Sequence, residues 1–188
     1  MKISIRTLFL SMALVGGAML FTSCDNDDDY KIIPATSVDQ AHGTYEGVIM
    51  VNNEFQDSVT ISVDSVSNTV SLSNLPVAPI VKALVGEELA DSVMKTVEAP
   101  ALSLNYTGTL YENIVQLQLD AQQVGFNMTV EDAEKQVTVF VNKGGEVLYD
   151  SMQKILNMGI TVDSVKIDGE LAENFKTIQY IFYQTKRK

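Results

Sequence analysis

The residue best placed for chemistry is Cys24, the single cysteine of a 188-residue chain. It follows an apolar run at residues 8–21 and the small residues Thr22 and Ser23, and an acidic run comes directly after it. With no second cysteine the thiol cannot form an internal disulfide, and with no histidine nearby it lacks the partners of a metal site. We therefore expect this thiol to be covalently modified.

The segment before Cys24 has the layout of a secretory signal peptide. Lys2 and Arg6 precede the apolar run LFLSMALVGGAMLF at residues 8–21, and small residues end it. The run is shorter than the roughly 18 residues that a membrane-spanning helix needs, and its pair of glycines favours a transient signal segment over an uncleaved membrane anchor. We therefore expect residues 1–23 to be removed.

The four residues FTSC, 21–24, resemble the lipobox of bacterial lipoproteins, although Phe21 stands where leucine is more usual. The resemblance implies cleavage directly before Cys24 and attachment of acyl chains such as palmitate to that residue. Each buried methylene contributes about 0.8 kcal/mol, so several chains on one residue hold a protein on a membrane. On this interpretation Cys24 is the lipidation site and the membrane is a partner of the protein.

Four aspartates crowd the positions after the cysteine: Asp25, Asp27, Asp28 and Asp29. An EF-hand calcium loop does not fit, because its glycine and glutamate positions hold Tyr30 and Thr36. One interpretation is a solvated spacer, since close like charges repel and extend the chain. The run also resembles the surface-export tether of Bacteroidetes-type lipoproteins, which implies an outer-membrane lipid anchor with the protein facing the exterior. The alternative is a periplasm-facing protein, because in enterobacterial sorting an aspartate after the lipidated cysteine signals retention at the inner membrane.

The charge of the chain excludes one class of partner. Cleavage before Cys24 leaves 11 basic against 24 acidic residues, a net charge of −13. The chain therefore lacks the basic patch that nucleic-acid binding requires.

We expect the basic residues 186–188 to be a frayed, solvated terminus. The length predicts a lipidated tether at residues 24–40 and a single β-rich domain at residues 41–188.

Catalytic residue types are scarce. His42 is the only histidine and lies beside Gly43 at the entrance to a predicted strand, a position that is more often incidental than catalytic. No serine lies in a G-x-S-x-G elbow. The triplet Asp-Ser-Val occurs four times, starting at Asp57, Asp64, Asp91 and Asp163. We interpret these triplets as turn chemistry rather than as a carboxylate site. We predict no enzyme, no metal site and no cofactor, with a hydrolase as the last-ranked alternative.

A β-domain has to position these side chains, because apolar and polar residues alternate in many short runs. The alternation is clearest at residues 59–63 and 115–119, and it predicts strands with one dry face. It recurs at residues 70–72, 102–106, 124–130, 137–141 and 178–182. Turn residues separate the runs at Asn52-Asn53, Ser67-Asn68, Thr107-Gly108, Lys143-Gly144-Gly145 and Asp168-Gly169. We expect a mainly β fold, an antiparallel barrel of about eight strands, with a β-sandwich as the alternative.

Two segments interrupt the β pattern with helical spacing. In residues 76–97 apolar side chains recur at three- and four-residue intervals, and Gly86 is expected to divide the segment into two pieces. A second short helix is expected at residues 151–158, ended by Gly159. We expect these helices to plug or cover the sheet.

The first predicted strand begins GTYEG at residues 43–47 and resembles the start of a lipocalin or calycin-type barrel. More closely, it resembles the calycin-like lipoproteins of unknown function found in Bacteroidetes. The resemblance implies a closed barrel, wide enough for packed side chains or one small ligand. The chain has Tyr45 where lipocalins carry tryptophan, so we do not expect their aromatic plug with its covering arginine.

Three functional hypotheses follow. The first is binding of a small apolar or amphipathic ligand or an extracellular partner, with aromatic side chains lining a cavity. The candidates are Tyr45, Tyr106, Phe126 and Tyr180, whose alternative role is ordinary core packing. The second is a structural or interaction lipoprotein with a filled barrel and no small-molecule ligand, which contacts a partner protein or host glycan through its outer surface. The third is a hydrolase.

Overall fold

The computed structural model of this chain describes residues 34–52 and 54–188, all within the compact unit Ile32–Lys188. The predicted signal peptide, Cys24 and the acidic run lie outside the described residues. A short 3-10 helix, η1 (Val38–Ala41), precedes the first strand. The strands are β1 (Gly43–Val51), β2 (Glu54–Asp64), β3 (Thr69–Leu72), β4 (Leu102–Tyr111), β5 (Ile114–Leu119), β6 (Gln122–Val130), β7 (Ala133–Val141), β8 (Glu146–Asp150), β9 (Ile155–Ile167), β10 (Glu170–Leu171) and β11 (Ile178–Arg187).

Eight of these strands close into an antiparallel barrel in the order β1, β2, β3, β4, β5, β8, β9 and β11. Closure is made by β11, which pairs with β9 on one side and with β1 on the other. The predicted barrel is therefore confirmed, and the sandwich alternative is not what the chain forms. A closed barrel leaves these strands without free edges.

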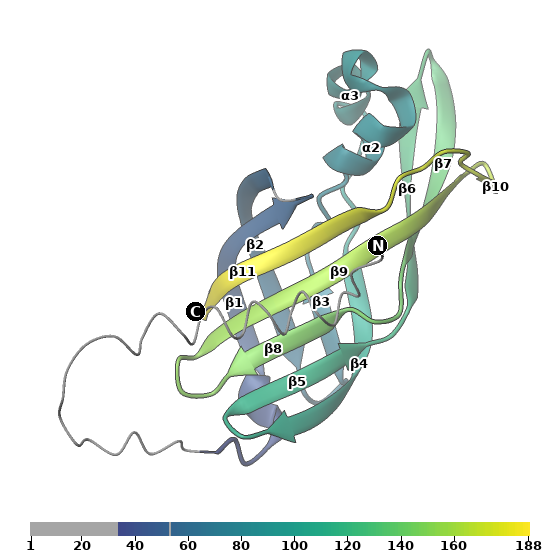
Figure 1. Cartoon of the computed structure of the whole chain (residues 1–188). Helices are drawn as coiled ribbons and strands as arrows, with labels where there is room; N and C mark the ends of the chain where they lie inside the picture. Colours follow the sequence, from purple (N-terminus) through teal and green to yellow (C-terminus); the bar gives the residue numbers. More distant parts are fainter. Residues whose placement is uncertain (1–33, 53) are drawn as a thin grey trace, which may run out of the picture. The chain divides into compact units, whose positions relative to one another are not determined.

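Three further strands extend the sheet outside the barrel. The hairpin β6–β7 pairs through β7 with the second half of β9, beyond the part of β9 that pairs with β8. The short β10 pairs with the end of β9. In Figure 1 this hairpin rises beside the two helices, at the end of the barrel opposite η1.

The predicted alternation places one side chain of every two in the barrel core. On β2 and β5 the predicted apolar residues are buried and the polar residues between them are more exposed. The largest fully buried side chains include Tyr45, Tyr180 and Phe182, which belong to β1 and β11. Large side chains thus occupy the barrel from the two strands that close it.

The predicted helical segment forms two helices, α2 (Ala78–Val85) and α3 (Glu87–Met94). Gly86 divides them with a φ of 81°, a left-handed conformation that favours glycine. Ile80 and Val81 of α2 are fully buried. The hydroxyl of Tyr180 donates a hydrogen bond of 2.9 Å to the carbonyl of Pro76, just before α2. This segment therefore covers the barrel end opposite η1, as the helical spacing indicated.

Two local predictions were wrong. Residues 151–158 do not form a helix: a turn ends at Lys154, whose φ is 57°, and β9 begins at Ile155. Leu156 and Met158 are fully buried on alternate positions of β9, so the two-residue period decides this segment. Gly108 does not mark a turn either, since β4 continues to Tyr111.

The reason for Gly108 is a close approach of η1. A Cβ atom at this position would lie 2.5 Å from Cγ1 of Val38, so a side chain would push η1 off the barrel. Glycine within a strand often marks such a close approach rather than a turn. The turn after β4 instead uses Glu112, with a φ of 52°.

Candidate functional site

The barrel end beside η1 is closed by the side chains of Tyr45 and Arg187, which we call the tyrosine plug. The Tyr45 hydroxyl donates a hydrogen bond of 2.7 Å to the carbonyl of Ala41 in η1. Nη2 of Arg187 donates to the carbonyls of Gln40, at 2.8 Å, and of His42. The guanidinium carbon lies 5.6 Å from the ring centre of Tyr45, within the range of a cation–π contact.

Two predictions are corrected by the tyrosine plug. An aromatic ring covered by an arginine was not expected, yet Arg187 lies over the Tyr45 ring and donates a hydrogen bond to its hydroxyl. The basic terminus is not frayed, because Arg187 belongs to β11 and Lys188 pairs with Glu46. The Tyr45 ring provides an aromatic face for stacking, and the Arg187 guanidinium provides the positive charge and the N–H donors.

Gly43 permits the approach of Arg187. Its φ of +146° lies in the region that glycine adopts readily, and a Cβ atom there would lie 2.7 Å from Nε of Arg187. Burial raises the pKa of Tyr45 to about 12, and the neighbouring Arg187 charge opposes that rise. Tyr149 of β8 meets the Tyr45 ring edge-on, with the ring centres 5.9 Å apart. The tyrosine plug is thus a packed structural contact between η1, β1, β8 and β11.

The four predicted cavity residues do not converge on one site. Tyr45 lies at the η1 end, and Tyr180 lies beneath the segment that leads into α2. Tyr106 is on β4, where burial raises the pKa of its hydroxyl. Phe126 is buried on β6, outside the barrel. All four side chains are buried in the hydrophobic core.

His42 lies beside Asp64 in a turn geometry. The backbone N–H of Ser65 donates to Nδ1 of His42 at 3.2 Å, and that atom is 3.9 Å from the Asp64 carboxylate. The Ser67 hydroxyl donates to Asp64 rather than to His42, at 2.8 Å. This bond and one from the Val66 N–H lower the pKa of Asp64. The predicted turn chemistry of this Asp-Ser-Val triplet matches these contacts.

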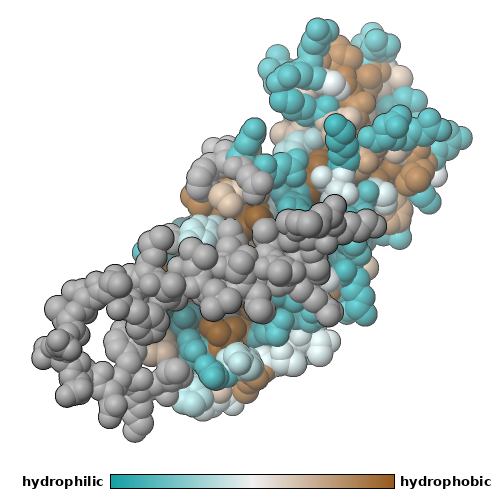
Figure 2. Space-filling model, in the orientation of Figure 1, coloured by the Kyte–Doolittle hydropathy of each residue, from teal (hydrophilic) through white to brown (hydrophobic). Residues whose placement is uncertain are grey.

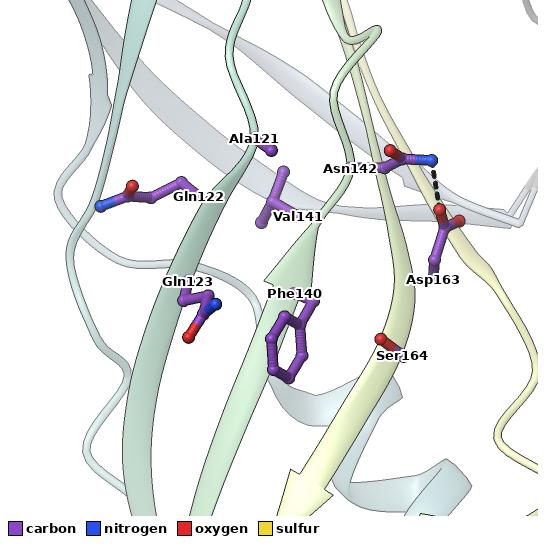
Figure 3. Close-up of a pocket in the computed structure, with 8 residues that line it drawn as sticks. All are labelled: Ala121, Gln122, Gln123, Phe140, Val141, Asn142, Asp163 and Ser164. Carbon is purple, nitrogen blue, oxygen red and sulfur yellow. Dashed lines mark hydrogen bonds between the residues drawn. The ribbon is translucent and has the colours of Figure 1, made fainter. Parts of the chain in front are cut away.

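A shallow pocket of about 510 Å³ lies outside the barrel, where β6 and β7 pass the middle of β9 (Figure 3). Its polar side chains come from three separate segments of the chain. The pocket is lined by Ala121, Gln122, Gln123, Phe140, Val141, Asn142, Asp163 and Ser164. None of the four predicted aromatic residues is among these lining residues.

A β-bulge positions Asp163 in this pocket. Phe140 pairs with Ser164 while the next residue of β7, Val141, pairs with Val162, so Asp163 is the extra residue of β9. Nδ2 of Asn142 donates a hydrogen bond to the Asp163 carboxylate, as Figure 3 shows. This Asp-Ser-Val triplet therefore lies within a strand, and interpreting it as turn chemistry was wrong. A bulge re-aims a side chain locally, which a simple two-residue period does not reveal.

The pocket combines one aromatic ring with several hydrogen-bonding groups. Gln123, Phe140 and Ser164 occupy directly paired positions on the three strands and so share one face of the sheet. Nζ of Lys166 lies 5.5 Å from the Phe140 ring centre. Such a set of side chains can hold a ligand that offers both an apolar face and hydroxyl groups.

Across residues 34–52 and 54–188, His, Cys, Asp and Glu side chains do not gather in groups of three or more that could hold a metal ion. The helices formed by the same residues lack the length and apolar character of a transmembrane span.

The fold and pocket define a closed eight-stranded antiparallel barrel with a site on its added outer sheet. Residues 40–167 match the model of a family described as a domain of unknown function, DUF4840. Because this match covers more than half of the chain, the chain belongs to that family. The matched range ends with β9, before the strand that carries Arg187. Comparisons with curated proteins and with solved structures gave no match.

Proposed function

We propose that this chain is a lipid-anchored envelope protein of the Bacteroidetes type that binds a neutral, hydroxyl-rich ligand of the glycan class at the cell exterior. The anchor is Cys24, and the binding site is the outer pocket at Phe140. The observation that carries the binding proposal is the pocket itself, which places an aromatic ring beside amide, hydroxyl and carboxylate groups.

The outer pocket supports this function better than a ligand inside the barrel. Large side chains from β1 and β11 occupy the barrel interior. One barrel end is covered by the tyrosine plug and the other by the segment that contains Ile80 and Val81. A barrel whose interior is packed with side chains offers a ligand its outer surface and loops, which agrees with the second of the three hypotheses.

The pocket chemistry selects the ligand class. A sugar ring presents apolar C–H groups that can pack on Phe140, and hydroxyls that can bond to the Gln122, Gln123 and Asn142 amides. The carboxylate of Asp163 accepts hydrogen bonds and disfavours anionic ligands, while the Lys166 ammonium at the Phe140 ring acts in the opposite direction. The net charge of −13 after cleavage tips the balance against anions.

Glycan-array binding of residues 24–188 tests the pocket. Phe140→Ala should weaken binding about tenfold, which corresponds to a loss of about 1.4 kcal/mol. Asn127→Ala is the matched control, because this exposed β6 side chain is not among the pocket-lining residues. Failure of the wild-type protein to bind any neutral glycan, or equal losses in both variants, would refute the ligand proposal.

The anchor is tested separately in cells. Cys24→Ala should abolish incorporation of labelled palmitate and release the protein from the membrane fraction. Retention of label and membrane association in this variant would refute lipidation at Cys24. Neither result depends on the outer pocket.

A further inference from the structure

Exposed apolar side chains gather in the turns and at a strand end on one side of the barrel, the η1 end. Among the described residues, seven large hydrophobic side chains are exposed, and four of them lie at the η1 end. These four are Val66 (90% exposed), Leu110 (43%), Tyr111 (70%) and Met152 (38%). Apolar residues reach the surface at the lower end of the view in Figure 2, where Figure 1 places the β4–β5 turn.

The strand register explains why these residues share one end. In an antiparallel barrel the β2–β3, β4–β5 and β8–β9 turns all lie at the same end, here that of η1. The N–H of Ser151 donates to the Asn113 carbonyl at 2.9 Å, which ties the turn of Met152 to the turn beside Tyr111. The N–H of Tyr106 donates to Asn68 at 3.0 Å, which ties the turn of Val66 to β4.

The N-terminal segment enters the fold at this same end. The N–H of Ala35 donates a 2.7 Å hydrogen bond to the carbonyl of Glu112, the residue directly after Tyr111. Residues 25–33 separate Cys24 from the first described residue, Pro34. At full extension this stretch reaches about 35 Å, roughly the length of one barrel strand. A lipid on Cys24 would therefore tether the domain to the bilayer by its η1 end.

We propose that the η1 end is a membrane contact, in which Val66, Tyr111 and Met152 enter the bilayer interface. This inference rests on the proposed lipid anchor. Tyrosine suits this depth because its ring is apolar and its hydroxyl stays hydrated. Lys154, in the same turn as Met152, can extend its ammonium toward lipid phosphates.

This contact also orients the site. The pocket lies at the start of β6, after β5 has crossed the barrel away from the η1 end. With Tyr111 at the bilayer, the pocket and α3 face away from the membrane. The membrane contact thus leaves Phe140 accessible to ligands from outside.

The chain allows a test without background signal, since it has no tryptophan and only one cysteine. Residues 24–188 retain every described element, and the Cys24 thiol can be coupled to a maleimide-bearing lipid in phosphatidylcholine vesicles with brominated acyl chains. The tryptophan of Tyr111→Trp should shift its emission to shorter wavelength and be quenched. Leu171→Trp is the control, because Leu171 is 61% exposed on β10 at the opposite end.

Chemical coupling separates this inference from lipidation in the cell. The membrane contact is supported if Tyr111→Trp and Met152→Trp are both quenched while Leu171→Trp is not. Absence of quenching in these two variants, or equal quenching in Leu171→Trp, would overturn it even if palmitate labelling confirms the anchor. Tyr111 at the end of β4 and Met152 in the β8–β9 turn are both exposed, and unfolding curves in urea check that the variants are folded.

Discussion

At the residue scale, Arg187 connects the end of the chain to its beginning. Its guanidinium donates to the carbonyl of Gln40 in η1, to that of His42 directly after η1, and to the Tyr45 hydroxyl. Hydrogen bonds from a charged donor contribute more than neutral ones, although water can partly replace these bonds because Arg187 is exposed. Arg187 therefore helps to hold η1 on the barrel, together with the Tyr45 bond to Ala41 and the packing of Val38 on Gly108.

Replacing Arg187 by glutamine should lower the free energy of unfolding by about 1 kcal/mol, measured by urea denaturation. Lys186→Gln is the matched control, since Lys186 is the preceding residue of β11, is exposed like Arg187 and is not part of the tyrosine plug. We expect the control to change stability by less than about 0.5 kcal/mol. Equal losses would mean that Arg187 acts only through its charge.

The raised pKa of Tyr45, about 12, predicts a loss of stability in alkali. The folded chain holds this proton more tightly than the unfolded chain, so the free energy of unfolding should fall as pH rises from about 10 to 12. Tyr45→Phe should reduce that fall. Tyr180 and Tyr106, whose pKa values burial also raises, should leave a residual decline.

The measurement is a series of urea unfolding curves across this alkaline range. Tyr111→Phe is the control, because the Tyr111 side chain is 70% exposed. Its alkaline decline should match that of the wild-type protein. If Tyr45→Phe also keeps the full decline, the Tyr45 hydroxyl is not the group responsible.

At the element scale, the contact between β1 and β11 depends on a glycine. A Cβ atom on Gly47 would lie 2.6 Å from Cγ2 and 2.8 Å from the backbone Cα of Thr185. Thr185 is fully buried, and its hydroxyl donates to the Leu156 carbonyl on β9. The three strands that close the barrel thus meet where Gly47 has no side chain.

Gly47→Ala should destabilise the domain by about 1–3 kcal/mol, because a backbone atom blocks the added methyl group. Gly125→Ala is the comparison, since a Cβ atom there has its nearest neighbour at 3.5 Å, the Val137 carbonyl oxygen. We expect this second variant to be within about 0.5 kcal/mol of the wild type. Thermal unfolding of both proteins measures the difference, and equal midpoints would contradict the close approach.

At the scale of the whole molecule, the acidic run is predicted to decide which side of the membrane carries the domain. Replacing the four aspartates from Asp25 to Asp29 by alanine should protect the domain from protease added to intact cells. A variant with alanine at Glu88, Glu98, Glu170 and Glu173 controls for the loss of four charges, because these side chains are exposed within the domain. Unchanged cleavage of the tether variant would leave the run as a spacer.

The sequence by itself determined the β class, the main strands and the division of the helical segment at Gly86. It could do so because alternation and turn residues are local properties, set within a few residues. It also supplied the expectation of a lipidated Cys24. Local patterns failed at residues 151–158, where a helical interpretation competed with the two-residue period that continues through β9.

Only the tertiary structure decided the closure of the barrel, the tyrosine plug and the outer pocket. Arg187 meets His42 across 145 positions of sequence, and the pocket joins three segments through the strand register. The bulge at Asp163 shifts that register by one residue, which no single run of residues reveals. Long-range pairing sets these contacts because it depends on how the strands close on one another, not on the period of any one strand.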